Sequence, residues 1–238
     1  MESIKGKRVL VTGATGGIGS RVAKLLAGSG AQVFITGRNA EKLAEVATQA
    51  GILEERAIAG DVANEADVAR LSAAINAQVP ALDVLVIASG IGIIKPIEQL
   101  SGSELMQTLQ ANLLGPFNLV KAFLPAMKEQ KKGLIVNIPG VLGKVPMAGA
   151  AAYSASKYGL VGMMQSIREE LKRTEIRFTN LYLGGVDSPF WDTIDLRVQR
   201  ERMIQAEEAA KAIWFLCQQP LSGVVSEMVL QPFNHQAI

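Results

Sequence analysis

The chain has 238 residues, of which 49% are hydrophobic and 19% charged, and its formal net charge is +2. This balance is typical of a globular domain and gives no reason to expect a nucleic-acid or membrane partner. The single cysteine, Cys217, excludes an intramolecular disulfide and favours a reducing, cytoplasmic compartment. Residues 1–8 show no signal-peptide pattern, and no apolar run is long enough to cross a bilayer.

Short apolar segments alternate with helical patterns along the whole chain. The predicted strands are residues 8–12, 31–36, 56–60, 83–88, 134–138, 176–183 and 225–230. The predicted helices are residues 20–29, 39–50, 64–78, 103–129, 152–174 and 207–219, with Asn39 and Asn64 as N-caps. Because the strands are apolar on both faces, they predict a parallel sheet covered on both sides. We therefore expect one doubly wound α/β domain over residues 1–238, since no repeat or linker divides the chain.

A glycine-dense turn lies between the first predicted strand and the first helix. It comprises Gly13, Ala14, Thr15, Gly16, Gly17, Ile18 and Gly19. Glycines there allow the backbone to approach a pyrophosphate, and the helix N-terminus supplies amide donors. The spacing differs from the common G-x-G-x-x-G fingerprint, and a glycine turn can also be purely structural. Its place after the first strand predicts dinucleotide binding.

Tyr153 and Lys157 are the candidate catalytic pair. Four residues apart, they share one face of the predicted helix 152–174. A nearby ammonium favours the phenolate, so Lys157 is expected to lower the pKa of Tyr153 and make it an acid/base group. Taken alone, this spacing also occurs by chance in many helices. A catalytic role is favoured over chance because the helix of this pair follows the fifth strand, at the end of the sheet where ligands bind in this fold.

In order along the chain, the motifs resemble those of the short-chain dehydrogenase/reductase family. The matching residues are Thr12 and Gly13 with Gly17 and Gly19, Asp61 and Val62, Asn112, Tyr153 with Lys157, and residues 184–189. The resemblance covers essentially the whole chain. It implies one Rossmann-type domain with a seven-stranded parallel sheet flanked by helices, in a homotetramer or homodimer. It also implies an oxidoreductase that acts on a small carbonyl or alcohol substrate.

The resemblance assigns roles to individual residues. Tyr153 would donate the proton, Lys157 would tune it and hold the nicotinamide ribose, and Asn112 would hold a water of a proton relay. Asp61 and Val62 would lie beside the adenine and Ser188 beside the nicotinamide carboxamide, with Gly90 and Val186 completing the cofactor contacts. Without the resemblance, Asp61 is an ordinary strand-end cap, and Asn112 is a poor helix former kept for local packing.

The end of the second strand bears on the choice of cofactor. It reads Thr36-Gly37-Arg38, without the carboxylate that accepts from a ribose 2′-hydroxyl. Arg38 could pair with a 2′-phosphate, so we expect NADP(H). The basic residue that often precedes the second glycine of the turn in NADP-using members is absent, because Gly16 stands there. Arg38 as a solvated loop charge is the alternative.

Two segments depart from the family pattern. Ile87-Ala88-Ser89-Gly90 replaces the usual Asn-Asn-Ala-Gly. Gly140 stands thirteen residues before Tyr153, where the family has a substrate-binding serine, and no Ser or Thr occurs between Leu134 and Ala152. Losing one such donor typically costs about 10²–10³ in rate. A water, a substrate group, Ser89 or Ser154 are the possible replacements, and both serines are weak candidates.

Residues 188–206 are predicted to form a short substrate lid with two aromatic side chains, Phe190 and Trp191. Two hypotheses follow. The first is an NADP(H)-dependent carbonyl reductase, favouring activated carbonyls such as vicinal diketones. The second is an NADP(H)-binding protein with little turnover, a sensor or partner-binding module, and Gly140 motivates it. His235 receives no catalytic role, and no metal-ligand cluster is predicted. Met163, Met164 and Trp214 are expected in the core or a subunit interface.

Overall fold

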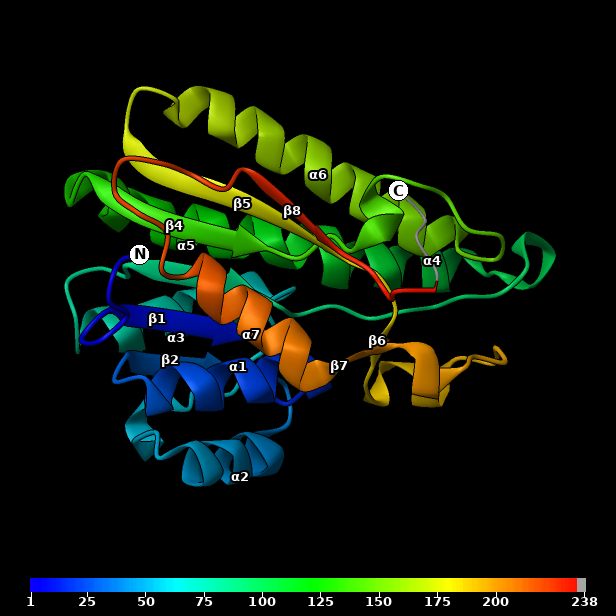
Figure 1. Cartoon of the computed structure of the whole chain (residues 1–238), viewed down its shortest axis with the longest axis horizontal. Coiled ribbons are helices and arrows are strands. Elements are labelled where there is room, and N and C mark those ends of the chain that lie inside the picture. The colour runs from blue at the N-terminus through cyan, green and yellow to red at the C-terminus, as the bar shows by residue number, and fades with distance from the viewer. Residues whose placement is uncertain (235–238) are drawn as a thin grey trace.

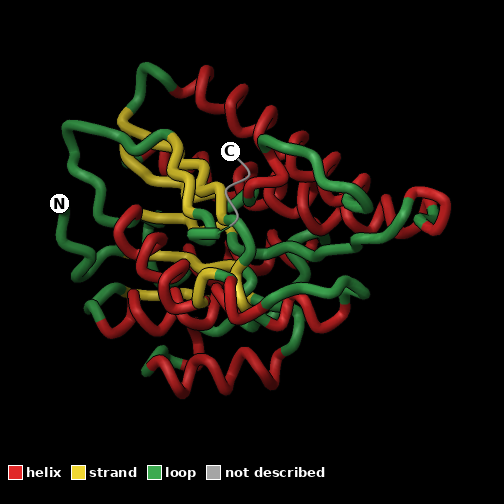
Figure 2. Tube along the Cα trace, turned by 45° about the vertical axis from the view of Figure 1, so that its right-hand side comes forward, coloured by secondary structure: helices red, strands yellow, loops and turns green. Residues whose placement is uncertain are grey.

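The computed structural model describes residues 1–234 and has strands alternating with helices (Figures 1 and 2). His235 lies outside the described residues. Six parallel strands form the main sheet in the order β2-β1-β3-β4-β5-β8. Their bounds are β1 Arg8–Thr12, β2 Gln32–Thr36, β3 Val84–Ile87, β4 Lys132–Asn137, β5 Glu175–Leu183 and β8 Glu227–Leu230. The doubly wound α/β fold is confirmed.

Two of the helices begin at the asparagine N-caps that the sequence predicts. They are α1 Gly17–Gly28, α2 Ala40–Ala50, α3 Glu65–Asn76, α4 Gly102–Leu109, α5 Gly115–Glu129, α6 Ala151–Leu171 and α7 Ala206–Leu216. Asn39 accepts a hydrogen bond from the backbone N–H of Lys42, and Asn64 accepts from those of Ala66 and Asp67. Both predicted N-caps are therefore confirmed.

The predicted strand at residues 56–60 is wrong. This segment forms one isolated bridge, between Ala57 and Ile35, so the sheet has six strands and not seven. It still runs beside β2, since the N–H of Ile58 donates to Ile35 over 3.0 Å. The Ile58 carbonyl, however, accepts from the Thr36 hydroxyl and not from a strand amide. Small residues such as Ala59 and Gly60 also have little side chain to pack on a pleated surface.

The predicted helix 103–129 is interrupted. Between α4 and α5 lies a π-helical turn, η3, over Gln110–Leu114, and it contains Asn112. Pro116 has no N–H for the carbonyl of Asn112 four residues earlier, so the α-helical pattern cannot pass through this point. Such π turns are often found at functional sites.

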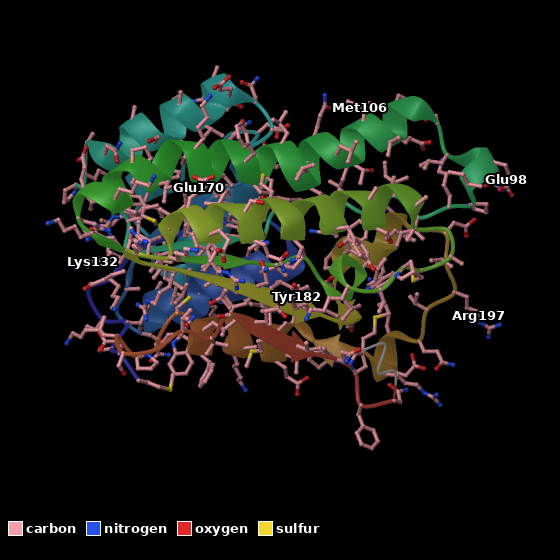
Figure 3. The ribbon with its side chains drawn as sticks, turned by 90° about the horizontal axis from the view of Figure 1, so that it is seen from above. Glu98, Met106, Lys132, Glu170, Tyr182 and Arg197 are labelled. Atoms are coloured by element: carbon pink, nitrogen blue, oxygen red, sulfur yellow. The ribbon has the colours of Figure 1, made fainter. Side chains whose placement is uncertain are left out.

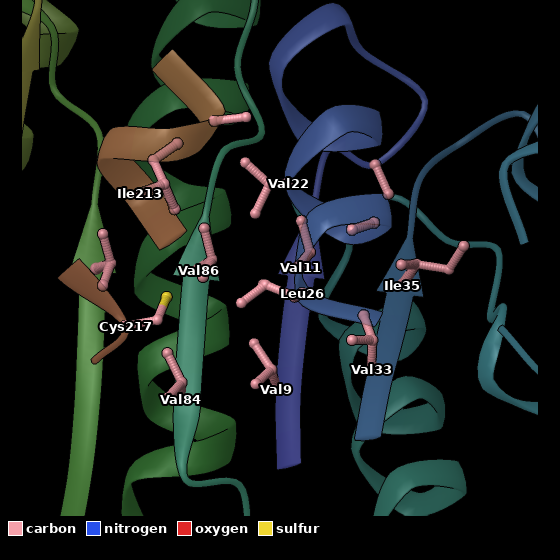
Figure 4. Close-up of a cluster of buried hydrophobic side chains, with 14 of the residues drawn as sticks. Val9, Val11, Val22, Leu26, Val33, Ile35, Val84, Val86, Ile213 and Cys217 are labelled. Atoms are coloured by element: carbon pink, nitrogen blue, oxygen red, sulfur yellow. The ribbon is translucent and has the colours of Figure 1, made fainter. Parts of the chain in front are cut away.

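Both faces of the sheet are buried. Figure 4 shows the cluster on one face, where Val9, Val11, Val84 and Val86 pack against α1 and α7. The alternate residues of the same strands, among them Leu10 and Leu85, belong to the cluster packed against α3, α5 and α6. Burial on both faces fixes the strands, so the loops at their carboxyl ends have a rigid base. No helix among residues 1–234 is both long and apolar enough to cross a bilayer.

Candidate active site

The site is organised around the point where the strand order reverses, between β1 and β3. Ligands bind beyond the carboxyl ends of the strands at such a point. Gly13, directly after β1, has a φ of 65°. A Cβ atom on Gly13 would lie 2.8 Å from the Ala88 carbonyl and from the Ser89 backbone. Only glycine therefore allows the loops after β1 and β3 to touch.

The other turn glycines bring the start of α1 close to its neighbours. A Cβ on Gly19 would lie 2.3 Å from the Gly13 carbonyl oxygen, and one on Gly17 would lie 2.8 Å from the side chains of Ser188 and Pro189. No side chain caps α1 at Gly16. The first amides of α1 are thus available to an anion, which suits a pyrophosphate.

A cavity of about 350 Å³ extends from this turn along the ends of β1 and β2. Seven of the predicted cofactor-binding residues line it: Gly13, Thr15, Gly16, Arg38, Asp61, Val62 and Gly90. The elongated set of loops fits the adenosine half of a dinucleotide, with glycines at the turn and a guanidinium at the end of β2. Residues from several separate loops of the sequence thus line one cavity.

Arg38 and Asp61 lie at the predicted adenosine end of the cavity and differ in their contacts. A Cβ on Gly37 would lie 3.0 Å from a methyl carbon of Thr15, so there is little room for a side chain at Gly37. Arg38 is the charged residue that lines the cavity directly after β2. No described residue pairs with the Arg38 side chain. Asp61 accepts a hydrogen bond from the Ala63 N–H over 2.9 Å, so it also caps a local turn, as the alternative interpretation held.

Helix α6 places Tyr153 and Lys157 on one side of a second cavity, of about 610 Å³. Lys157 Nζ lies 5.4 Å from the centre of the Tyr153 ring and donates to the Ile138 carbonyl over 3.2 Å. The lysine residue is only 5% exposed, whereas Tyr153 is partly exposed to the cavity. A Cβ on Gly90 would lie 3.6 Å from Lys157 Nζ. Because Gly90 lines both cavities, the pair stands at their junction.

Burial sets the protonation of both groups. It raises the pKa of Tyr153 to about 12 and lowers that of Lys157 to about 8. The direction for Tyr153 is opposite to the prediction, because the removal of water outweighs the attraction of the lysine. Tyr153 therefore carries its proton throughout the neutral range, as a proton donor must. Lys157 remains mostly a cation at pH 7.

Asn112 is fully buried and anchors the π-helical turn. Its Oδ1 accepts from the Ile91 N–H over 2.8 Å, and its Nδ2 donates to the Ile91 carbonyl and to Ser156 Oγ. Ser156 in turn donates to the Tyr153 carbonyl over 2.7 Å. The amide of Asn112 is thus linked to the helix that carries Tyr153 and Lys157. Sequence reasoning missed Ser156, whose only signal is its place between Tyr153 and Lys157.

Gly140, at the position of the missing serine, has a φ of 69° and a ψ of 170°. That conformation is essentially restricted to glycine, so a serine at this position would strain the backbone. Gly140 lines the second cavity. Of the two candidate hydroxyls, Ser89 lines both cavities, and its Oγ lies 3.1 Å from Thr12 Oγ1. Ser154 Oγ is buried without a hydrogen-bond partner and does not line either cavity.

The predicted lid closes one side of the second cavity. In the lid, the Phe190 ring stands edge-on to the Tyr153 ring, with ring centres 5.8 Å apart. It is also edge-on to the Trp191 ring, with centres 5.3 Å apart. Phe190 packs directly on Gly92, where a Cβ would lie 2.2 Å from the ring. Short strands β6 Val186–Asp187 and β7 Ile204–Gln205 pair at the two ends of the lid. Ile18, Val186 and Ser188, all predicted cofactor contacts, line this cavity.

The remaining candidates lie away from the site. Met164 is buried in the core, Met163 packs against the same cluster, and Trp214 donates to Ser29 Oγ over 2.9 Å. Among residues 1–234, no cluster of His, Cys, Asp and Glu side chains could hold a metal ion. Burial raises the pKa of the Cys217 thiol to about 12, which keeps it unreactive.

Comparison with known proteins places these features in a wider group. The sequence pattern of short chain dehydrogenases matches residues 7–198. An uncharacterised oxidoreductase of Staphylococcus epidermidis is 28% identical over 98% of this chain and 100% of its own. A metagenomic short-chain oxidoreductase in complex with NADP is 30% identical, with a TM-score of 0.82 over 97% of this chain and 99% of its own. An actinorhodin polyketide ketoreductase with NADPH is 27% identical, with a TM-score of 0.83 and 98% of each chain covered.

Proposed function

The chain belongs to the short-chain dehydrogenase family of oxidoreductases, and we propose that it is an NADP(H)-dependent carbonyl reductase. One observation carries the proposal. The glycine-lined cavity and the apolar cavity share Ala88, Ser89 and Gly90, and Tyr153 and Lys157 stand at that junction. A carbonyl group in the apolar cavity would therefore have a proton donor beside it and a nicotinamide within reach.

Each residue has a distinct task in this proposal. The glycine turn, Val186 and Ser188 would hold a nicotinamide cofactor, which would supply a hydride for the carbonyl carbon. The carbonyl π electron pair moves to oxygen, which takes the proton of Tyr153 Oη and gives the alcohol. The Lys157 cation stabilises the phenolate left on Tyr153, and Asn112 with Ser156 holds the helix that carries both. A proton relay through Asn112 remains part of the proposal.

Arg38 supports the choice of NADP(H). It lines the cofactor cavity after β2 and has no partner among the described residues, so its guanidinium is free to bind a 2′-phosphate. The NADP and NADPH in the two solved relatives agree with this choice.

Gly140 supports a restricted substrate range. Without a serine hydroxyl at this position, less stabilisation is available to the oxygen that gains charge, and activated carbonyls such as vicinal diketones tolerate that loss best. Ser89 Oγ or a water would be the replacement donor.

The decisive experiment is NADPH oxidation with a panel of ketones, aldehydes and vicinal diketones. Tyr153→Phe should abolish turnover while leaving NADPH binding intact. Tyr158→Phe is the matched control, because Tyr158 is exposed on the same helix, donates to the Lys144 carbonyl and lines neither cavity. Reduction that survives in Tyr153→Phe would show that this site is not the catalytic one.

A second function rests on Gly140. A wild-type protein that binds NADPH but reduces no member of the panel would be a sensor or partner-binding module of the same family. We also propose a cytoplasmic homotetramer or homodimer. Leu114 and Phe117, 41% and 43% exposed at the start of α5, support an interface between subunits. Light scattering of the purified protein tests the assembly.

A further inference from the structure

The charges along the apolar cavity are all of one sign. Most of its wall is aliphatic or aromatic and includes Ile94, Leu142 and Met147. Its charged lining residues are Lys157, Arg197 and Arg202, and no described Asp or Glu belongs to the lining. Positive charges on a wall of low dielectric constant focus the potential and attract anions.

The lid arginines fall into two groups. Arg200 is committed within the lid, because it bonds the Ser188 carbonyl and pairs with Asp192 over 2.7 Å and with Asp187 over 3.4 Å. The side chains of Arg197 and Arg202 are exposed and make no hydrogen bond or ion pair among the described residues. Figure 3 shows Arg197 projecting from the lid at the end of the molecule opposite Lys132. Two guanidiniums are therefore left free at the mouth of the cavity.

We propose that Arg197 and Arg202 bind the anionic group of the substrate, so that the natural substrate is an oxo acid. Its carbonyl lies beside Tyr153, an apolar segment lies along the cavity wall, and its carboxylate reaches the lid. The pairing of β6 with β7 and the bonds of Arg200 hold the two arginines at the rim. A guanidinium binds a carboxylate in two parallel hydrogen bonds, which fixes the orientation of the substrate as well as its affinity.

This inference rests on the proposed carbonyl reduction, so the first test does not need turnover. Hexanoate and hexanamide are titrated calorimetrically into the protein saturated with NADPH. Hexanoate should bind roughly tenfold more tightly, because charge-assisted hydrogen bonds at an exposed rim act at the low end of their range. The preference should disappear in the double variant Arg197→Ala/Arg202→Ala. It should persist in Arg173→Ala, an exposed arginine just before β5 at the opposite end of the sheet.

The second test uses turnover. Methyl-ketone carboxylates of increasing chain length are compared with their methyl esters, and kcat/KM should favour the acids, with an optimum length that measures the span from Tyr153 to the lid. Raising the salt concentration should reduce the advantage of the acids, and the double variant should lose it.

The outcomes separate the two proposals. Binding of hexanoate through the arginines without any carbonyl reduction would support the anion site and contradict the proposed enzyme. Equal kcat/KM values for acids and esters, with equal affinities for hexanoate and hexanamide, would overturn the oxo-acid inference. The proposed carbonyl reductase activity would not be contradicted by that result. A loss of NADPH affinity in the double variant would also overturn it, because the arginines would then serve the cofactor's phosphates.

Discussion

Asn112 Nδ2 donates a hydrogen bond to Ser156 Oγ over 3.0 Å, although the two residues are 44 positions apart in the chain. This bond joins the π-helical turn to the helix that carries Tyr153 and Lys157. Both groups are fully buried, so neither can exchange this bond for one with water.

The first prediction concerns this bond. Ser156→Ala leaves one buried donor of Asn112 without a partner, and we expect a loss of about 1–3 kcal/mol in the free energy of unfolding together with a lower kcat. Ser154→Ala is the matched control, because Ser154 Oγ is buried without a partner. Its removal should be neutral or stabilising in urea denaturation. Equal losses from both substitutions would contradict a positioning role for Ser156.

The second prediction concerns Gly140. Restoring a serine there forces a side chain into a conformation with φ of 69° and ψ of 170°, and we expect Gly140→Ser to lose about 1–3 kcal/mol of stability. Gly140→Ala carries the same backbone strain without the hydroxyl. A higher kcat in Gly140→Ser than in Gly140→Ala would measure the contribution of the serine hydroxyl as a hydrogen-bond donor, apart from the backbone strain. Full stability in both variants would show that the backbone changes readily.

The third prediction concerns the buried charge of Lys157. Its pKa falls from the usual 10.5 to about 8, so the unfolded chain binds more protons than the folded one between these values. Burial of the charged Lys157 therefore lowers the free energy of unfolding by its full amount below pH 8. This destabilisation decreases as the pH rises to 10.5. Lys157→Met should be inactive yet more stable than wild type, by on the order of 2–3 kcal/mol at pH 7.

The same titration predicts a pH profile. As Lys157 loses its proton near pH 8, kcat/KM for carbonyl reduction should fall, because the neutral amine no longer stabilises the phenolate. Thermal unfolding of wild type and Lys157→Met from pH 7 to 10.5 checks the stability difference. A difference that grows with pH would have the wrong sign and refute this account.

The fourth prediction concerns Arg38. Arg38→Ala should weaken NADPH binding about 10- to 100-fold, as expected for a lost charge-assisted hydrogen bond, while NADH binding stays the same. Lys42→Ala is the control, since Lys42 is an exposed cation in the first turn of α2. Fluorescence titration with both cofactors gives the ratio. An equal effect on NADH would mean that Arg38 does not read the 2′-phosphate.

The fifth prediction concerns the contact between the lid and Gly92. A methyl group there would lie 2.2 Å from the Phe190 ring, so Gly92→Ala should displace the lid, raise KM and cost about 1–3 kcal/mol. Gly92→Ala/Phe190→Leu should recover part of that stability, because the shorter side chain leaves room. Additive losses in the double-mutant cycle would show that the two residues are not in contact.

Several elements could be predicted because their signals are local. The strands follow from runs of apolar residues, the starts of α2 and α3 from Asn39 and Asn64, and the cofactor turn from glycines placed after a strand. The family pattern added Asn112, Tyr153 and Lys157. The predicted strand at residues 56–60 failed because a group from another segment competes there: the Thr36 hydroxyl donates to the carbonyl of Ile58.

The sequence by itself determined the doubly wound fold and brought Tyr153 and Lys157 to one face of one helix, because periodicity and spacing act within a few residues. Only the tertiary structure decided that burial raises the pKa of Tyr153, that Gly140 has a positive φ, and that Ser156 meets Asn112. It also left Arg197 and Arg202 unpaired at a cavity without acidic walls among its described residues. Those properties depend on which distant segments exclude water and supply partners, and only the packed chain brings these segments together.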